Sequence, residues 1–82
     1  MEKVIGIFEG EKIDLEEIKN KDGKLVVNLY MLSGRDLIKM GVKDNELCKE
    51  LRAVPNREFI TIKAEVQEYK SKLYLRALAL IS

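Results

Sequence analysis

The stretch that decides the fold is residues 57–82, REFITIKAEVQEYKSKLYLRALALIS. In its first part the even-numbered positions from Ile60 to Val66 are apolar, whereas the odd-numbered positions from Phe59 to Tyr69 are polar or aromatic. This two-residue period predicts a strand with one face in a core. After a turn at residues 70–72 the chain resumes as a second strand, whose buried row we expect to be Leu73, Leu75, Ala77, Ala79 and Ile81.

The side of this hairpin that faces away from the core carries both aromatic rings and cations. Phe59, Lys63 and Tyr69 lie on that side of the first strand, and Tyr74 and Arg76 on that side of the second. Aromatic rings stack on nucleic-acid bases, and cations attract phosphates. The pattern therefore indicates a surface suited to a single-stranded nucleic acid.

Length and composition indicate one small globular domain, residues 1–82. The chain is 46% hydrophobic and 35% charged, which is neither a disordered nor a membrane-like composition. Its apolar runs are far shorter than the ~20 residues that span a bilayer. The amino terminus lacks the apolar core of a signal peptide. We therefore expect a cytoplasmic protein without a membrane partner.

The residues that usually perform catalysis or bind metals are scarce. Cys48 is the single cysteine, which excludes an intramolecular disulfide, and we expect it on the buried side of a helix. Histidine is absent, which removes the commonest general base and the commonest transition-metal ligand. The adjacent pair Glu16 and Glu17 would point to opposite faces of a strand. We therefore expect no enzyme, no metal and no cofactor.

Charge is unevenly distributed along the chain. Residues 1–18 hold six acids and two bases, a balance of −4, and residues 19–82 hold thirteen bases and eight acids, a balance of +5. The second part would attract a polyanion, although less than strongly basic nucleic-acid-binding proteins do.

The first third of the chain reads as strands. Residues 3–9 are rich in β-branched residues, and Ile13 and Leu15 then alternate with acids, as in a second strand or the continuation of a long, bent first one. Gly6 and Gly10 would tolerate the bend. The Asp22-Gly23 pair is typical of a tight hairpin turn, and residues 25–32 follow as a clear strand.

A helical segment is expected next. Ser33 and Asp36 have the spacing of a helix-capping pair, which predicts a helix that Gly41 ends. Asp44 is a second candidate cap, and Leu47, Cys48 and Leu51 recur at helical spacing before Pro55. The predicted order is three strands, a helical insert and two strands. This is the order of a small five-stranded Greek-key barrel, a mainly β fold.

Two segments carry a resemblance to a known family: residues 22–30, DGKLVVNLY, and residues 57–70, REFITIKAEVQEYK. They resemble the middle and fourth strands of OB-fold single-stranded-DNA-binding proteins, in which a helix joins those strands. The resemblance spans most of the chain and is one of pattern. It implies a barrel that binds through the outer face of its middle strands and the flanking loops, here including residues 68–72.

We therefore expect binding of single-stranded nucleic acid with little sequence preference, by a monomer small enough to need self-association or a protein partner. The rings expected to stack on bases are Tyr30, Phe59, Tyr69 and Tyr74. The cations expected to contact phosphates are Lys63, Lys70, Lys72 and Arg76.

One observation keeps an alternative open. Asp14 and Glu16 would lie on the outward row of the second strand, where they repel phosphates. Either the ligand avoids that strand and follows the later ones, or the surface serves a protein. In the second case the domain is an interaction or assembly module that pairs through its sheet edge or its aromatic face.

Overall fold

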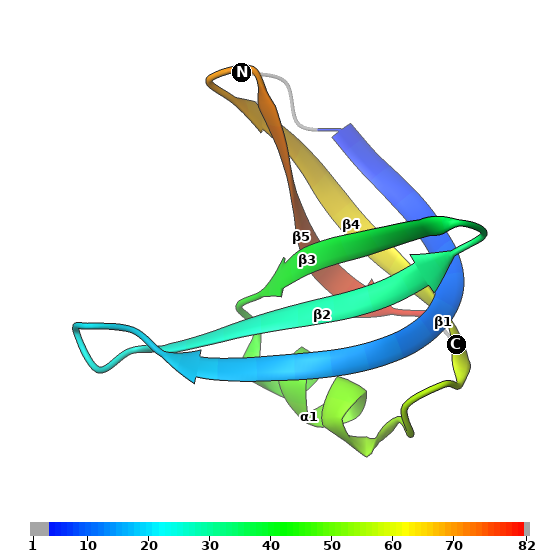
Figure 1. Cartoon of the computed structure of the whole chain (residues 1–82), viewed down its shortest axis with the longest axis horizontal. Coiled ribbons are helices and arrows are strands. Elements are labelled where there is room, and N and C mark those ends of the chain that lie inside the picture. The colour runs from blue at the N-terminus through cyan, green and yellow to red at the C-terminus, as the bar shows by residue number, and fades with distance from the viewer. Residues whose placement is uncertain (1–3, 82) are drawn as a thin grey trace.

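The computed structural model describes residues 4–81, which form a closed β-barrel with a helix across one end (Figure 1). The elements in chain order are β1 (Val4–Lys19), β2 (Leu25–Ser33), β3 (Asp36–Val42), α1 (Asn45–Ala53), β4 (Phe59–Tyr69) and β5 (Lys72–Leu80). The predictions of a mainly β fold, of a five-stranded barrel and of a helix between the third and fourth strands are confirmed.

The strands follow one another around the barrel in the order β1-β2-β3-β5-β4. The barrel closes because β1 pairs antiparallel with both β2 and β4. β3 and β5 are parallel and are joined at two positions, Gly41 with Arg76 and Val42 with Ala77. This strand order, with the helix after β3, is that of a small OB-like barrel.

The first strand is long and bent, and it supplies two walls of the barrel. Its first half, to Glu11, pairs with β4, and its second half, from Glu11 to Lys19, pairs with β2. An irregularity between Lys12 and Asp14 marks the change. The prediction of one continuous, bent strand is therefore the correct one of the two readings, although Lys3, its expected first residue, lies outside the described residues.

The prediction of a helix that starts near Ser33 is wrong, because residues 36–42 form strand β3. A tight turn through Gly34, which has a φ of +64°, folds this strand back onto β2, and Leu29 pairs with Met40 and Met31 with Ile38. The apolar residues of so short a segment fit either a helical or a strand period. Pairing with β2 decides between them, because it buries Met40 and Val42 in the barrel.

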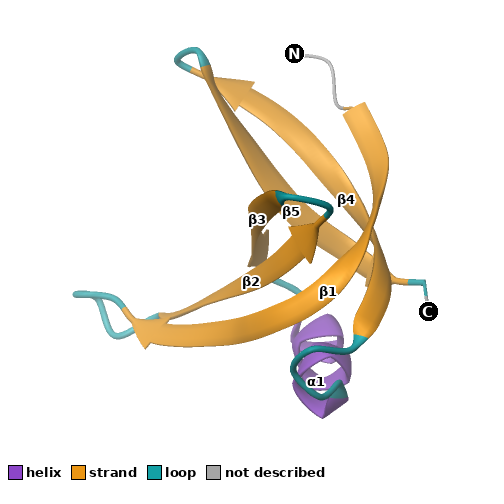
Figure 2. Cartoon of the chain, turned by 45° about the vertical axis from the view of Figure 1, so that its right-hand side comes forward, coloured by secondary structure: helices purple, strands orange, loops and turns teal. Residues whose placement is uncertain are grey.

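The helix predicted after Asp44 is confirmed. The Asp44 carboxylate accepts hydrogen bonds from the backbone N–H groups of Glu46 (2.8 Å) and Leu47 (3.4 Å), as an N-cap does. Leu47, Cys48 and Leu51 are buried against the barrel. In Figure 2 the helix lies across the lower end of the barrel, which it closes.

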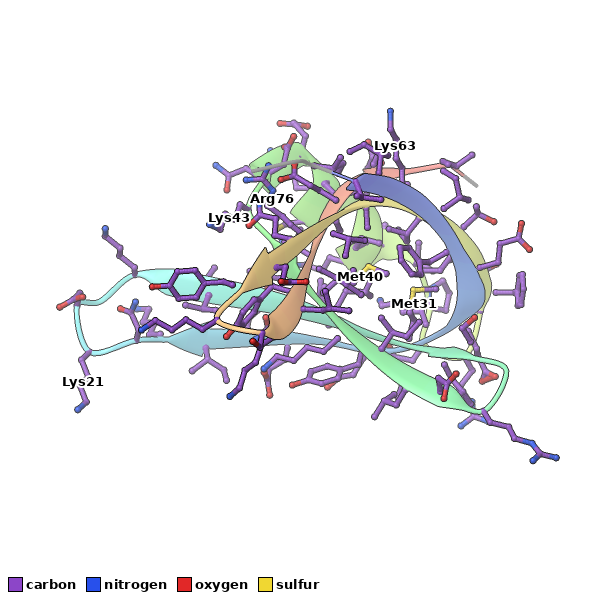
Figure 3. The ribbon with its side chains drawn as sticks, turned by 90° about the horizontal axis from the view of Figure 1, so that it is seen from above. Lys21, Met31, Met40, Lys43, Lys63 and Arg76 are labelled. Atoms are coloured by element: carbon purple, nitrogen blue, oxygen red, sulfur yellow. The ribbon has the colours of Figure 1, made fainter. Side chains whose placement is uncertain are left out.

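The core occupies the inside of the barrel, and Figure 3 shows Met31 and Met40 within the ring of strands. The predicted alternation of β4 is confirmed as far as Ala64, since Ile60, Ile62 and Ala64 are buried. Beyond it, Val66 is only half-buried, and Glu65, expected on the outward row, is buried. The largest fully buried side chains are Leu29, Met31, Met40, Leu51 and Ile62.

The predicted buried row of β5 holds for Leu75 and Ala77 only. Leu73, expected inside, is 70% exposed, and the alternation fails after Ala77. Ala64 pairs with Ala77 and Lys63 with Ala79, so residue 78 is an extra residue on β5. Such a bulge reverses which face the following side chains occupy. Leu80 consequently packs against the core, whereas Ala79 and Ile81, expected inside, follow the outward row, and Ile81 is 53% exposed.

Lys12 ties the helix to the barrel. Its backbone N–H donates to the carbonyl of Glu58 (2.8 Å), and its carbonyl accepts from the N–H of Arg57 (2.6 Å). The side chain is 3% exposed, and its ammonium group donates to the carbonyl of Leu51 (2.7 Å) and to that of Val54 at the helix C-terminus. A cation is favourable there because the helix end carries partial negative charge.

Replacing Lys12 by methionine tests this anchor. The substitution keeps the length of the side chain and leaves the carbonyls of Leu51 and Val54 without this donor. We expect a loss of about 1 to 3 kcal/mol in the free energy of unfolding, measured by urea titration. Lys63→Met is the control, because Lys63 is exposed on β4 and its loss should change stability by less than about 0.5 kcal/mol. If the two substitutions lowered the free energy of unfolding equally, the assignment of Lys12 as the anchor of the helix would be contradicted.

A comparison of the native protein with Lys12→Met also gives a pH test. Burial lowers the pKa of Lys12 from its ordinary value of 10.5, an effect that the nearby Asp14 carboxylate partly opposes. The folded protein therefore releases this proton at lower pH than the unfolded chain does. The native protein should gain stability relative to Lys12→Met as pH rises through the folded-state pKa towards 10.5. If the native protein instead lost stability relative to Lys12→Met over that pH interval, the lowered pKa of Lys12 would be contradicted.

Gly10 stands where β1 passes closest to the end of β2. A Cβ atom at this position would overlap the carbonyl group of Leu32, which is rigid backbone. We expect Gly10→Ala to destabilise the protein by about 1 to 3 kcal/mol in urea unfolding. Gly41→Ala is the matched control in a strand interior, because its Cβ would only approach the Leu75 carbonyl to 3.8 Å. Similar losses of stability in both variants would show that position 10 does not lie tightly against the Leu32 carbonyl.

Candidate nucleic-acid interface

The hairpin of β4 and β5 forms an arm that extends beyond the barrel (Figure 1). Tyr69 pairs with Lys72, and Gln67 pairs with Tyr74. Paired residues lie on the same side of a sheet, as do residues two apart on one strand. Tyr69, Lys72, Gln67 and Tyr74 therefore share one side of the arm, the side that continues the outer face of the barrel.

Both tyrosines of this arm are open to solvent. Tyr69 is 57% exposed and Tyr74 is 50% exposed. They are diagonal neighbours across the strand pair, a spacing of roughly 7 to 8 Å between backbone positions. The ammonium group of Lys70 lies 5.3 Å from the centre of the Tyr69 ring, within the range of a cation–π contact. We name Tyr69, Lys70, Lys72 and Tyr74 the arm cluster.

The turn that carries Lys70 has an unusual backbone. Lys70 and Ser71 have φ values of +50° and +65°, so both lie in the left-handed region. Two-residue hairpin turns need this conformation, and Asn-Gly is the pair that adopts it at least cost. The chain places a lysine and a serine there instead. The result is a tight turn that holds the Lys70 side chain beside the Tyr69 ring.

Arg76 lies on the same outer row, nearer the barrel, but its guanidinium group is engaged. One of its terminal nitrogens donates to the Glu65 carboxylate at 3.0 Å, and Glu65 is only 4% exposed. The Gln67 side chain also donates to Glu65. Arg76 therefore has much of its charge neutralised by a buried partner.

Lys63 and Phe59 continue the outer row of β4 away from the arm. Lys63 is exposed, and in Figure 3 its side chain points away from the barrel. Phe59 is 66% exposed but lies at the opposite end of β4 from Tyr69, paired with Glu11. The structure therefore does not bring Phe59 together with the arm cluster.

Tyr30 is also separate from the arm, on the outward row of β2. It is half-buried, its neighbours across the sheet are Asp14 and Lys39, and its hydroxyl donates to the Glu16 carboxylate at 3.2 Å. The same Glu16 oxygen accepts from the Asn28 amide at 3.2 Å. Asp14 and Glu16 thus do lie on an outward row, where their charge disfavours phosphates beside Tyr30.

A groove lies on another side of the molecule, between the end of the β1–β2 hairpin, the end of β3 and helix α1. Its volume is about 980 Å³. The lining includes the apolar residues Leu25, Val27 and Val42, together with Cys48. Burial raises the pKa of the Cys48 thiol, so this group stays neutral. The prediction of a buried Cys48 on the helix is confirmed.

Cations surround this apolar floor. Lys24, Lys43, Lys49 and Arg52 line the groove, and Glu46 is the one carboxylate among its lining residues in the described part of the chain. Sequence reasoning singled out neither Lys24 nor Lys43 as a binding residue. The groove brings residues 20–28 together with residues 41–52, so no local pattern could have indicated it.

Among residues 4–81 no group of three or more cysteines and carboxylates is placed to hold a metal ion. No helix in that range has the length and apolar character needed to cross a membrane.

Comparison with known proteins adds no assignment. The sequence matches no family model, and a search of curated proteins finds no similar sequence. The function must therefore be argued from the arm cluster and its surroundings.

Proposed function

We propose that the protein binds single-stranded nucleic acid, with little sequence preference, through the arm cluster. The observation that carries this proposal is the exposed pair Tyr69 and Tyr74 on one side of the arm, with Lys70 and Lys72 beside them. Tyrosine rings stack on any base, and ammonium groups contact the phosphates between bases. The combination suits a strand that runs along the outer side of the arm.

The surroundings of the cluster support this path. Among the paired residues of β4 and β5, the carboxylate on the same side as the cluster is Glu65, which is buried and paired with Arg76. Glu68 lies on the opposite side of the arm, paired with Leu73. Lys63 extends the positive surface along β4, and Arg76 contributes less because Glu65 neutralises it. Tyr30 and Phe59 are left out of the proposed path.

The conformation of the turn also supports a role for Lys70. A non-glycine residue in a sparsely populated backbone region costs of order 1 to 3 kcal/mol and is often retained for function. Lys70 and Ser71 both occupy such a region, where Asn-Gly would be cheaper. The lysine at this tip is better explained by a contact with an anion than by stability.

A second candidate function, an interaction module, is favoured by a different observation. Ile5, Ile7 and Ile81 are 48%, 56% and 53% exposed, and Ile7 and Ala79 flank Lys63 on the outer face. Exposed aliphatic side chains gathered on one sheet face are typical of protein contacts. This candidate predicts self-association or capture of a protein without salt-dependent binding of oligonucleotides.

Fluorescence anisotropy with a labelled oligo(dT) and a matching duplex tests the first proposal. We expect saturable binding to the single strand, reduced by Tyr69→Ala and by Tyr74→Ala. Loss of one stacked base costs about 1 to 3 kcal/mol, or roughly 5- to 150-fold in affinity. Phe59→Ala is the control, because it removes an exposed ring that lies outside the arm cluster. Flat titrations would favour the interaction module, and equal losses of affinity in all three variants would contradict a binding site confined to the arm cluster.

The turn offers a test that separates affinity from stability. In the double variant Lys70→Asn, Ser71→Gly, the backbone strain is relieved and one cation is removed. We expect the free energy of unfolding to rise by about 1 kcal/mol. The slope of log affinity against log salt should become shallower by about 0.7, the value for one contact to single-stranded nucleic acid. A more stable variant with an unchanged slope would remove Lys70 from the interface.

A further inference from the structure

We propose that the groove between the β1–β2 hairpin and helix α1 is a second binding site, for a short acidic peptide segment of a partner protein that also carries aliphatic or aromatic side chains. The proposal does not depend on nucleic-acid binding by the arm. The groove and the arm tip lie at ends of different hairpins, which project in different directions in Figure 1.

Charge is the first argument. Of the four cations that line the groove, Arg52 is paired with Glu17 of β1, and Lys49 lies 3.6 Å from Glu46. Lys24 and Lys43 form no ion pair with any carboxylate of the described residues. Lys24 lies just before β2, and Lys43 lies just after β3. The groove therefore presents two uncompensated ammonium groups to a ligand.

Apolar surface is the second argument. Leu25 is 55% exposed, although it belongs to the same strand row as the buried Val27. Leu25 is the first residue of β2, in the β1–β2 hairpin, and this hairpin extends past the end of the barrel (Figures 1 and 2). An apolar side chain of a partner would bury Leu25 over the floor formed by Val27, Val42 and Cys48.

The lining distinguishes a peptide from a nucleic acid. None of the lining residues in the described part of the chain is aromatic, and the one guanidinium group is bound to Glu17. Bases bind single-strand sites by stacking on rings or on arginine, and neither is available here. Carboxylates for Lys24 and Lys43 and an apolar side chain for Leu25 are the groups that this surface complements. Its volume falls within the range of ~300 to 1,000 Å³ typical of ligand clefts.

The probe is a fluorescein-labelled synthetic peptide in which aspartates flank a central leucine–phenylalanine pair. Two comparison peptides carry lysine in place of aspartate, or serine in place of the apolar pair. We expect the probe to bind the full chain with saturation, and both comparison peptides to bind at least about tenfold more weakly. The first loses the charge complementarity, and the second loses the apolar burial.

Three variants locate the binding. The double variant Lys24→Glu, Lys43→Glu should bind the probe at least tenfold more weakly, because the new glutamates repel the aspartates of the peptide. Leu25→Asp should also weaken probe binding by tenfold or more, because it replaces an apolar side chain of the groove with a carboxylate. Lys63→Glu is the matched control, because it makes the same charge change on the exposed outer face of β4. Circular dichroism establishes that each variant is folded.

Several results would overturn the proposal. They are the absence of saturable probe binding, equal binding of the lysine peptide, and equal weakening by Lys63→Glu. Competition would also overturn it, if oligo(dT) displaced the probe and the groove variants bound oligo(dT) more weakly than the native protein does. That result would assign the groove to nucleic acid. Probe binding that persists while oligo(dT) titrations are flat would support the groove site and reject the function proposed for the arm.

Discussion

The hydrogen bonds of Lys12 hold together the two parts of the molecule. Its backbone fixes residues 57 and 58 on β1, and its buried ammonium group fixes the last turn of α1. The segment between these points leads directly into β4, so the same residue sets where β4 starts and which of its faces turns inward. The desolvation of one charge is offset by two carbonyl partners and by the helix dipole.

The surface chemistry is divided among separate regions of the barrel wall. The second half of β1 carries Asp14 and Glu16 on its outer row, where Glu16 binds the hydroxyl of Tyr30. The arm carries tyrosines and lysines, and the groove beside α1 carries lysines above an aliphatic floor. A polyanion is therefore repelled from one part of the barrel and attracted to another. Such a division orients a ligand before any close contact forms.

Sequence reasoning succeeded where one local pattern determined the structure. The inward residues Ile60, Ile62 and Ala64 of β4 were assigned correctly, although Glu65, expected outward, is buried, and Asp44 caps its helix with neighbouring backbone groups. It failed where a distant partner decides. β3 is a strand because β2 pairs with it, the bulge at residue 78 reverses Ala79 and Ile81, and the carboxylate that engages Tyr30 comes from another strand. The groove is also a product of tertiary structure alone.

The wall of the barrel is weakest between β3 and β5. Two residue pairs join these strands, whereas β1 is paired along nearly its whole length with β2 and β4. Parting β3 from β5 leaves every antiparallel pairing and the Lys12 anchor in place. The closed barrel and an open, rolled five-stranded sheet therefore differ by one short contact, and the cheapest local opening of the molecule begins at the residues next to Arg76 and the base of the arm.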